Sequence, residues 1–428
     1  MNTLTGWTVS NLEDLVHINR ESLNEQTPRD CSFYYIDIAS ASEGKLNFPS
    51  TKITFRESPS RARRIVRQHD VLMSTVRPNL RAFAYFDRVD DVFIASTGFA
   101  VLTAREQTDP RFVLYAILSD FTFRQIDASL IGSNYPAINS SAVHQLKIVT
   151  PPKPEQAKIA EILSVVDRAI EKTEALIHKQ HRIKTGLMQD LLTRGIDEHG
   201  KLRTESTHSF KDSPLGRIPI EWADGSLESV ASFVTSGSRG WAQYYSNEGA
   251  IFLRIGNLTR AHINLRLDDL VLVKPPISSE GKRTSVQPGD LLISITADLG
   301  IIGMVPPDLG EAYVNQHISL IRLKNQLVNP RFVGWFLSSS GGQSQFEAFN
   351  ESGAKAGLNL PTVKRLIVPL PSLAEQSQIA KTLDESTACA NAYIERGQKL
   401  RSLKTALMQD LLTGKKSVTP LLEPIFTH

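Results

Sequence analysis

Two stretches of this chain are near-copies of each other: PEQAKIAEIL at residues 154–163 and AEQSQIAKTL at residues 374–383. Each leads, at the same distance, to the sequence LMQDLLT, at residues 187–193 and 407–413. The chain therefore repeats itself with a period of 220 residues. The repeats of solenoid proteins are only about 20 to 50 residues long. We therefore expect each copy to be a globular domain followed by a helix.

The repeated stretches predict two long helices. Apolar or small residues recur in steps of three and four, which is typical of a coiled-coil seam. In the first copy these are Ile159, Ile162, Val166, Ala169, Thr173, Leu176, Gln180, Ile183 and Leu187. In the second they are Ile379, Thr382, Ser386, Cys389, Tyr393, Arg396, Leu400, Leu403 and Leu407. We expect the helices to pair antiparallel and to act as a spacer about 52 Å long, at about 1.5 Å per residue.

The sequence before each helix is repeated too, more faintly. HDVLMSTVR at 69–77 matches GDLLISITA at 289–297, and DPRFVLYAIL at 109–118 matches NPRFVGWFLS at 329–338. Each globular part combines several short strands, a helix that opens at Pro110 or Pro330, and a short last strand. The predicted fold class is α+β (mixed α/β), with two tandem-repeat globular domains separated by two long helices that form an antiparallel coiled coil.

The same patterns predict the domain boundaries. The first globular domain is expected at residues 1–150 and the first helical region at 151–195. A polar connector and the second globular domain follow at 196–370, the second helical region at 371–414, and a tail at 415–428. The sequence leaves open whether the tail is loose or docked.

Composition excludes several classes of protein. With only Cys31 and Cys389, a disulfide framework or a cysteine zinc site is not expected. No apolar run reaches the roughly 18 residues of a membrane span, and the first residues do not resemble a secretory signal. We therefore expect a cytoplasmic protein. The net charge of +3 is too small to indicate nucleic-acid binding by itself.

The local distribution of charge says more. The stretch from residue 56 to residue 81 contains seven arginines and only two acidic residues, Glu57 and Asp70. These are Arg56, Arg61, Arg63, Arg64, Arg67, Arg77 and Arg81. Such a density of positive charge suits phosphate groups, which dominate affinity for DNA and RNA. A solvated helix face with ordinary surface arginines is the alternative.

Sequences that resemble catalytic motifs are incomplete. DPRF and NPRF resemble the amino-methyltransferase motif, but an arginine replaces its second proline and no glycine-rich cofactor loop accompanies them. GIDEHGKL at 195–202 lacks the Ser/Thr of a phosphate-binding loop and follows a helix rather than a strand. We therefore expect a chain without catalytic activity of its own.

The paired helix starts, the LMQDLLT ends, STVRPNLRA at 74–82 and PLGRIPIEW at 214–222 resemble the specificity subunit (HsdS) of type I restriction-modification systems, over nearly the whole chain. The resemblance implies two target-recognition domains, each reading half of an asymmetric bipartite DNA target. It implies helices that space the halves and dock two methyltransferase (HsdM) subunits, and two further restriction (HsdR) subunits. It places S-adenosylmethionine, ATP and Mg²⁺ in those partners and no cofactor or metal in this chain.

Candidate DNA-contacting residues follow from this. In the first domain they are Arg61, Arg63, Arg64, Arg67, Arg77, Arg81, Ser133, Asn134 and Tyr135. In the second they are Ser236, Ser238, Arg239, Tyr244, Lys355 and Asn359. An arginine can bind guanine with two hydrogen bonds, although Arg77 and Arg81 are equally suited to phosphate or carboxylate partners.

Three alternatives accompany these candidates. The loops at 132–141 and 352–361 are about as well explained as structural caps of the helices that follow them. Trp241 is expected in the core, and His317 is expected to be a buried, hydrogen-bonded residue. For the whole chain, a DNA-modifying enzyme that works alone and a coiled-coil protein-binding scaffold are the alternatives.

Overall fold

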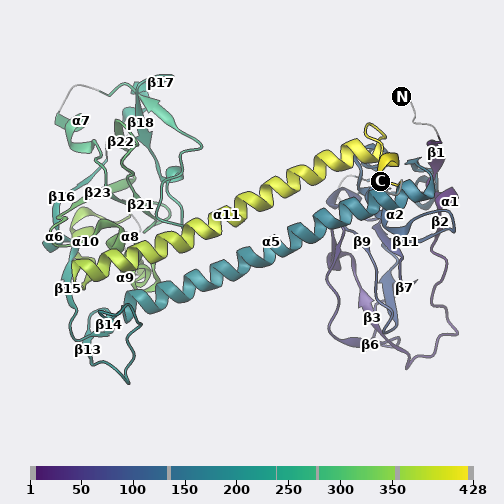
Figure 1. Ribbon diagram of the computed structural model, residues 1–428, viewed down its shortest axis with the longest axis horizontal. Helices are drawn as coiled ribbons and strands as arrows, with labels where there is room; N and C mark the ends of the chain where they lie inside the picture. Colours follow the sequence, from purple (N-terminus) through teal and green to yellow (C-terminus); the bar gives the residue numbers. More distant parts are fainter. Residues whose placement is uncertain (1–5, 133–135, 238, 276–278, 352–356, 423–428) are drawn as a thin grey trace, which may run out of the picture. The chain divides into compact units, whose positions relative to one another are not determined.

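The computed structural model describes residues 6–132, 136–237, 239–275, 279–351 and 357–422 (Figure 1). The chain divides into two compact units. Unit 1 comprises Met1–Glu174 with Glu395–His428, and unit 2 comprises Ala175–Ile394. Each unit therefore contains one globular domain together with a part of both long helices.

Two four-stranded sheets form the globular part of unit 1. One has the order β2 (Val16–Ile18), β11 (Phe99–Ala104), β8 (Val71–Ser74), β9 (Phe83–Tyr85). The other has the order β6 (Lys52–Thr54), β3 (Ser32–Ile36), β10 (Phe93–Ser96), β7 (Ala62–Val66). Two-stranded pairs join β1 (Thr8–Asn11) to β12 (Lys147–Thr150) and β4 (Ala41–Ser42) to β5 (Lys45–Leu46). In β8 all four side chains are buried, as expected for a strand covered on both faces.

Helices pack on the first of these sheets. They are α1 (Leu12–Leu15), α2 (Pro110–Leu118), α3 (Asp120–Ala128) and α4 (Ser140–Gln145), with 3-10 turns η1 (Ile38–Ser40), η2 (Pro78–Leu80) and η5 (Thr419–Leu421) elsewhere in the unit. The start of α2 at Pro110 is as predicted: Asp109 caps it by accepting a hydrogen bond from the N–H of Phe112 at 2.9 Å. The core of this layer joins α2 to the sheet through Phe112, Val113, Met73 and Phe83.

Unit 2 repeats this arrangement. Its sheets have the orders β16 (Ala231–Ser236), β23 (Ile318–Leu323), β20 (Leu291–Ser294), β21 (Ile302–Met304) and β17 (Tyr245–Ser246), β19 (Val271–Val273), β18 (Ala250–Leu253), β22 (Ala312–Val314). The pairs are β15 (Ala223–Ser226) with β24 (Ile367–Leu370) and β13 (Phe210–Ser213) with β14 (Gly216–Pro219). The helices are α6 (Leu227–Val230), α7 (Ser279–Thr284), α8 (Pro330–Ser338), α9 (Ser340–Glu351) and α10 (Leu360–Arg365), with η3 (Trp241–Tyr244) and η4 (Ile255–Asn257).

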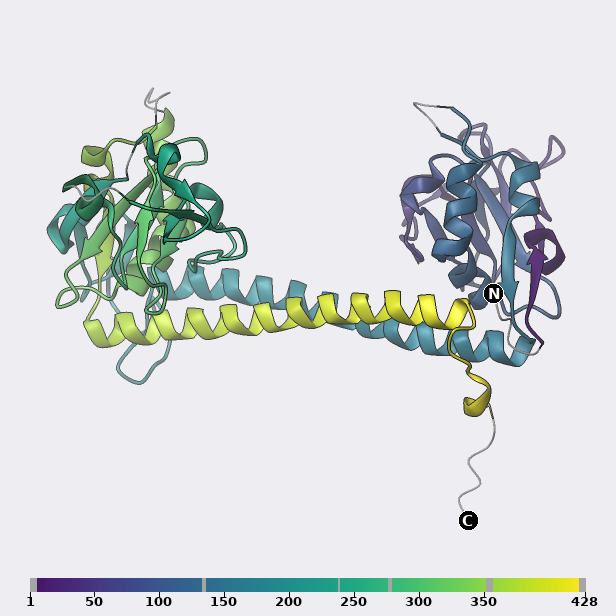
Figure 2. The ribbon, with the colours of Figure 1, turned by 90° about the horizontal axis from the view of Figure 1, so that it is seen from above.

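The two long helices are α5 (Lys153–Thr193) and α11 (Leu373–Leu412). In unit 1 the start of α5 packs beside the end of α11, so that Ile159 and Leu163 share one core with Leu411 and Leu412 (Figure 2). In unit 2 the roles are exchanged, and the start of α11 shares a core with the end of α5: Ile379, Leu383, Leu191 and Leu192. The helices are therefore antiparallel within each unit. The predicted mixed α/β fold with long paired helices is confirmed.

The predicted seam of the second helix is wrong at three positions. Cys389, Arg396 and Leu403 are exposed. Ile379 is buried as predicted, and further buried positions are Leu383, Thr387, Ala390 and Gly397. Small side chains carry too weak a hydrophobic signal to reveal which face they occupy, because a close helix approach buries Ala or Gly as readily as Leu.

The connector and the tail both dock on their own units. In the connector Ile196 is buried in the core of unit 2, and β13 adds regular structure. In the tail Val418 is 1% exposed and belongs to the core of unit 1. The question that the sequence left open is therefore answered for the tail as far as residue 422.

Candidate nucleic-acid interface

The turn between β8 and β9 holds two of the predicted arginines. Arg77 and Arg81 flank η2, and both have left-handed backbone conformations, with φ of 48° and 52°. Such a conformation is uncommon for residues other than glycine. The turn is tied to its neighbour because the N–H of Arg77 donates to the carbonyl of Pro136 at 2.7 Å. The predicted Ser133, Asn134 and Tyr135 immediately precede Pro136 in the sequence and lie outside the described residues.

The side chains of these two arginines differ in exposure. The guanidinium of Arg81 lies 4.2 Å from the centre of the Phe123 ring and 3.5 Å from the carboxylate of Asp120. These contacts hold it in one orientation. Arg77 is exposed at the surface of the turn. Of the two, Arg77 is the more exposed, and Arg81 contacts Phe123 and Asp120.

The arginines around β7 lie on a strand and not on a solvated helix face. Arg63 lies over the ring of Phe55, 4.9 Å from its centre, and Arg64 donates to Ser22 Oγ at 3.0 Å. Burial lowers the pKa of Arg64.

β7 is an edge strand of its sheet, and residues 21–23 cover that edge through two backbone hydrogen bonds. Arg67 is paired with Glu21 at 2.6 Å, and this hydrogen bond raises the pKa of Arg67. Arg61 is exposed. Arg63, Arg64 and Arg67 are therefore engaged within the domain.

Unit 2 keeps the backbone of the β8–β9 turn and changes its charge. Ala297 lies 220 residues after Arg77 and has the same left-handed conformation, with φ of 59°. The next residue, Asp298, pairs with Arg260. The corresponding turn thus carries an arginine in unit 1 and a neutralised aspartate in unit 2.

Several loops of unit 2 meet at one end of its sheets. The N–H of Gly237 donates to the carbonyl of Ile318, and the N–H groups of Ile295 and Leu358 donate to the carbonyls of His317 and Ile295. Residues 236–237, 239–240, 295–298, 315–318 and 357–359 are thereby brought together; we call them the loop cluster. In unit 1 the N–H of Thr75 donates to the carbonyl of Gly98 and that of Ile138 to the carbonyl of Thr75, which builds the corresponding cluster.

The predicted residues of this cluster have distinct surroundings. Arg239 is exposed, whereas Ser236 is half-buried and its carbonyl accepts a hydrogen bond from Arg283. Asn359 caps α10 by accepting from the N–H of Thr362 at 2.9 Å, as the structural alternative expected. Lys355 and Ser238 lie outside the described residues.

Aromatic and histidine side chains near the cluster have structural roles. Trp241 is buried, stacks on Phe252 with ring centres 5.6 Å apart, and belongs to the core as predicted. Tyr244 meets it edge to face at 5.9 Å. His317 is half-buried rather than fully buried, and its Nδ1 lies 2.7 Å from Thr296 Oγ1. The prediction that it is hydrogen-bonded is confirmed.

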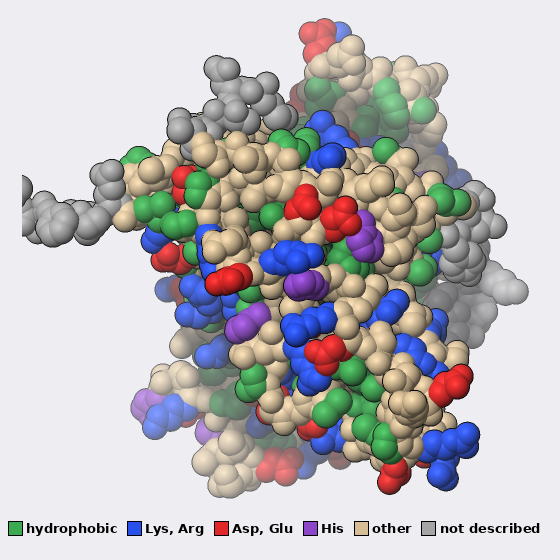
Figure 3. All heavy atoms as spheres, turned by 90° about the vertical axis from the view of Figure 1, so that its right-hand side faces the viewer, with side chains coloured by type: hydrophobic (Ala, Val, Ile, Leu, Met, Phe, Trp, Pro, Cys, Tyr) green, Lys and Arg blue, Asp and Glu red, His purple; other side chains and the backbone are tan. Residues whose placement is uncertain are grey.

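Charge on the surface is mixed. On the face that Figure 3 presents, the coloured lysine and arginine side chains are interspersed with acidic and histidine side chains and form no continuous basic surface. This face therefore carries charges of both signs.

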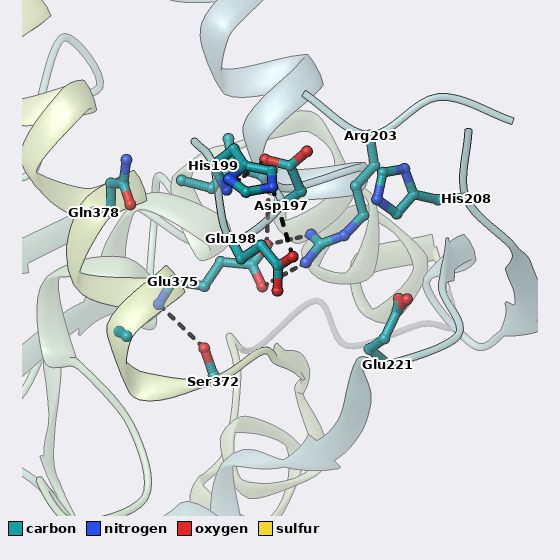
Figure 4. Close-up of a pocket in the computed structure, with 11 residues that line it drawn as sticks. Asp197, Glu198, His199, Arg203, His208, Glu221, Ser372, Glu375 and Gln378 are labelled. Atoms are coloured by element: carbon teal, nitrogen blue, oxygen red, sulfur yellow. Dashed lines mark hydrogen bonds and ion pairs between the residues drawn. The ribbon is translucent and has the colours of Figure 1, made fainter. Parts of the chain in front are cut away.

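Unit 2 contains a buried ion pair that the sequence patterns did not predict. Arg203 donates from Nη1 and Nη2 to the two carboxylate oxygens of Glu375, at 2.5 and 3.2 Å, and both side chains are 9% exposed (Figure 4). It lies at the floor of a cavity of about 720 Å³ that is also lined by Asp197, His199 and Gln378. The partners are far apart in sequence, and no local pattern connects them.

The described residues meet neither the requirements of a metal site nor those of a membrane span. Among the described residues no cluster of three or more His, Cys, Asp or Glu side chains is arranged to hold a metal ion. No described helix is both long enough and apolar enough to cross a membrane.

Comparisons with known proteins agree on one family. The family model described as type I restriction modification DNA specificity domain matches residues 5–179 and 219–404. A Methanocaldococcus jannaschii protein, named as the specificity subunit of the type I restriction enzyme MjaX, is 26% identical over 96% of this chain and 93% of its own length.

Solved structures share the fold. The S subunit of a type I restriction-modification system from M. genitalium has a TM-score of 0.60 at 15% identity, covering 96% of this chain and 97% of that one. A chain solved in work on complex assembly and conformational transition of the type I R-M system has a TM-score of 0.57 at 22% identity, covering 97% and 100%.

Proposed function

Because the chain belongs to the DNA specificity subunits of type I restriction-modification systems, we propose that each of its globular domains reads one half of a bipartite DNA target. Specificity subunits of this family are non-catalytic components of larger complexes. The first recognition domain is proposed to be residues 1–150, and residues 196–370 are proposed to hold a linker and the second recognition domain. The helical regions 151–195 and 371–414 are proposed to set the distance between the two half-sites.

One observation carries the proposal that the target is asymmetric. The two loop clusters have corresponding backbone hydrogen bonds, and the left-handed conformation recurs at Arg77 and Ala297. The side chains at this turn differ in charge, with Arg77 in one unit and Asp298, neutralised by Arg260, in the other. Because bases are distinguished by the side chains that reach them, two such turns would select different sequences.

Chemistry is assigned to partner subunits. Two methyltransferase (HsdM) subunits would dock on the helical regions, bring S-adenosylmethionine and methylate adenine in each half-site. Two restriction (HsdR) subunits would bring ATP and Mg²⁺. Such a complex works on DNA in the cytoplasm. Extrusion of the target base from the duplex would be the task of the methyltransferase subunits.

Methylome sequencing tests this proposal. N6-methyladenine would be mapped in host cells with and without the gene for this chain, with the partner genes expressed in both. The expected result is loss of methylation at one split, asymmetric motif. An unchanged methylome, with every subunit shown to be present, would contradict the proposal.

A further inference from the structure

Glu375, at the start of α11, has a full set of partners. Its carboxylate accepts hydrogen bonds from the guanidinium of Arg203, from Trp222 Nε1 at 3.2 Å and from the N–H of Ile196 at 2.9 Å. Two of these donors come from the connector that follows α5. The ion pair and the neutral donors together compensate the loss of hydration of this buried carboxylate.

Glu155 is the corresponding residue of unit 1, 220 positions earlier, and it lacks most of these partners. It is 7% exposed. Its Oε2 accepts from Trp7 Nε1 at 3.0 Å, as Glu375 accepts from Trp222. No described lysine, arginine or histidine lies within 4 Å of the carboxylate, and no hydrogen bond to Oε1 is formed by the described residues.

The nearby cations of unit 1 are engaged elsewhere. Lys415 and Lys416, which follow α11 as the connector follows α5, both pair with Asp410 at 3.3 Å. The tail beyond them places Val418 in the core. Lys158 pairs with Glu161 at 2.7 Å. The described part of the chain therefore offers Glu155 no counterpart to Arg203.

A buried carboxylate without a cation is costly to maintain, although the positive end of the α5 dipole offsets part of that cost. Glu155 keeps 7% of its surface exposed. No described residue of unit 1 takes the place beside Glu155 that Arg203 takes beside Glu375 in unit 2.

We propose that Glu155 is a binding site for an arginine side chain of the methyltransferase subunit, which docks on unit 1 as the connector docks on unit 2. The inference rests on the proposed function and adds the chemistry of one contact. Arginine fits better than lysine because its planar fork can satisfy Oε1 while sharing the carboxylate with Trp7. A nucleic acid does not fit, since a buried carboxylate repels phosphate.

The test compares Glu155→Gln with the wild-type chain. Glutamine keeps an acceptor for Trp7 and removes the charge. The thermal unfolding midpoint of each purified full-length chain would be measured, followed by its affinity for the purified methyltransferase subunit. We expect a midpoint no lower than that of the wild type, because the substitution removes an uncompensated buried charge. We expect an affinity at least about tenfold weaker, as is usual when one partner of a buried charged pair is removed.

Two control variants make the outcome specific. Glu375→Gln leaves Arg203 buried without its carboxylate, so it should lower the unfolding midpoint of the chain itself. Glu248→Gln, at a side chain that is 77% exposed in the globular part of unit 2, should leave both quantities at their wild-type values.

Either of two results would overturn the inference. One is an affinity of Glu155→Gln equal to that of the wild type. The other is a loss of thermal stability as large as that of Glu375→Gln, which would mean that Glu155 is already paired in the free chain. Failure of the wild-type chain to bind the methyltransferase subunit at all would instead overturn the proposed function together with this inference.

Discussion

The ammonium group of Lys404 on α11 lies 2.6 Å from a carboxylate oxygen of Asp167 on α5. Tyr115 of α2 donates to the same carboxylate at 2.8 Å, so that one residue joins both long helices to the globular part of unit 1. In unit 2 Lys184 occupies the place of Lys404 and lies over the ring of Trp335, 4.7 Å from its centre. The position of Asp167 is taken there by Thr387. The two units are therefore anchored to the same helices by different chemistry.

Replacing Asp167 should loosen this anchor. We expect Asp167→Asn to lower the free energy of unfolding by about 1 kcal/mol, because it removes a partly buried ion pair and keeps an acceptor for Tyr115. Urea denaturation of the purified chain measures this change. Glu161→Gln on the exposed side of α5 is the control and should cost less than about 0.5 kcal/mol. Equal effects of the two variants would contradict the assigned role.

Gly195 should be intolerant of any side chain. Its φ is +63°, and a Cβ there would lie 2.2 Å from Glu375 Oε1 and 2.3 Å from Trp222 Cζ2. Gly195→Ala should therefore displace the connector and cost more than the roughly 1 kcal/mol of backbone strain alone. Gly216→Ala is the matched control, because its φ of +87° is also positive but nothing lies within 4 Å of the added carbon. Thermal unfolding of both variants tests the difference, and similar midpoints would refute it.

The ionised carboxylate of Glu174 should stabilise unit 1 at neutral pH, and this stabilisation should be lost at acidic pH. Hydrogen bonds from Lys45 and from Arg401 hold the pKa of its carboxyl below the ordinary value of 4.5. A carboxyl with a lowered folded pKa contributes stability that is present above the unfolded pKa and lost as pH falls through the folded pKa. Glu174→Gln should remove this contribution, which is less than about 1 kcal/mol for a pair of this exposure. Unfolding free energies measured from pH 7 down to pH 3 should converge for the variant and the wild type; a constant difference would count against the assignment.

Arg77 should matter for one half-site only. We expect Arg77→Ala, in the assembled methyltransferase complex, to weaken DNA binding by about tenfold, in the range of 1 to 3 kcal/mol for one arginine contact with a base. Fluorescence anisotropy at several salt concentrations separates a base contact from a phosphate contact. Loss of a phosphate contact lowers the magnitude of the slope of log affinity against log salt concentration by about one. Asp298→Ala, at the corresponding turn of unit 2, is the control. Unchanged binding by Arg77→Ala would remove this turn from the interface.

The chain alone should transfer no methyl group. Purified protein incubated with labelled S-adenosylmethionine and mixed DNA should leave the DNA unlabelled, and addition of the methyltransferase subunit should restore labelling. Label transfer by the isolated chain would favour the alternative of a DNA-modifying enzyme that works alone.

Much of the fold was predictable because its signals are local. Pro110 and Pro330 mark the starts of α2 and α8, since proline suits the first turn of a helix. The repeat predicted two similar units with long helices, and the aromatic character of Trp241 placed it in the core. Each of these inferences depends on residues close together in the sequence or on the similarity between the two halves of the chain.

The candidate interface was less accessible to prediction. Sequence pattern gathered Arg63, Arg64 and Arg67 into one basic stretch, and only the folded chain engages them with Phe55, Ser22 and Glu21. It also did not reveal which face of α11 is buried, because Thr387, Ala390 and Gly397 carry little hydrophobic signal of their own.

Sequence alone determined that this protein is a duplication, that its halves have the same fold and that long helices follow them. The tertiary structure decided that equivalent residues of the two halves, 220 positions apart, have different surroundings. Glu155 and Glu375 begin their helices in nearly identical sequences, PEQ and AEQ. Only Glu375 acquires a cation, because the connector brings Arg203 to it across 172 positions of the chain. Burial and ion pairing depend on what the remote chain brings into contact, and a local sequence does not contain that information.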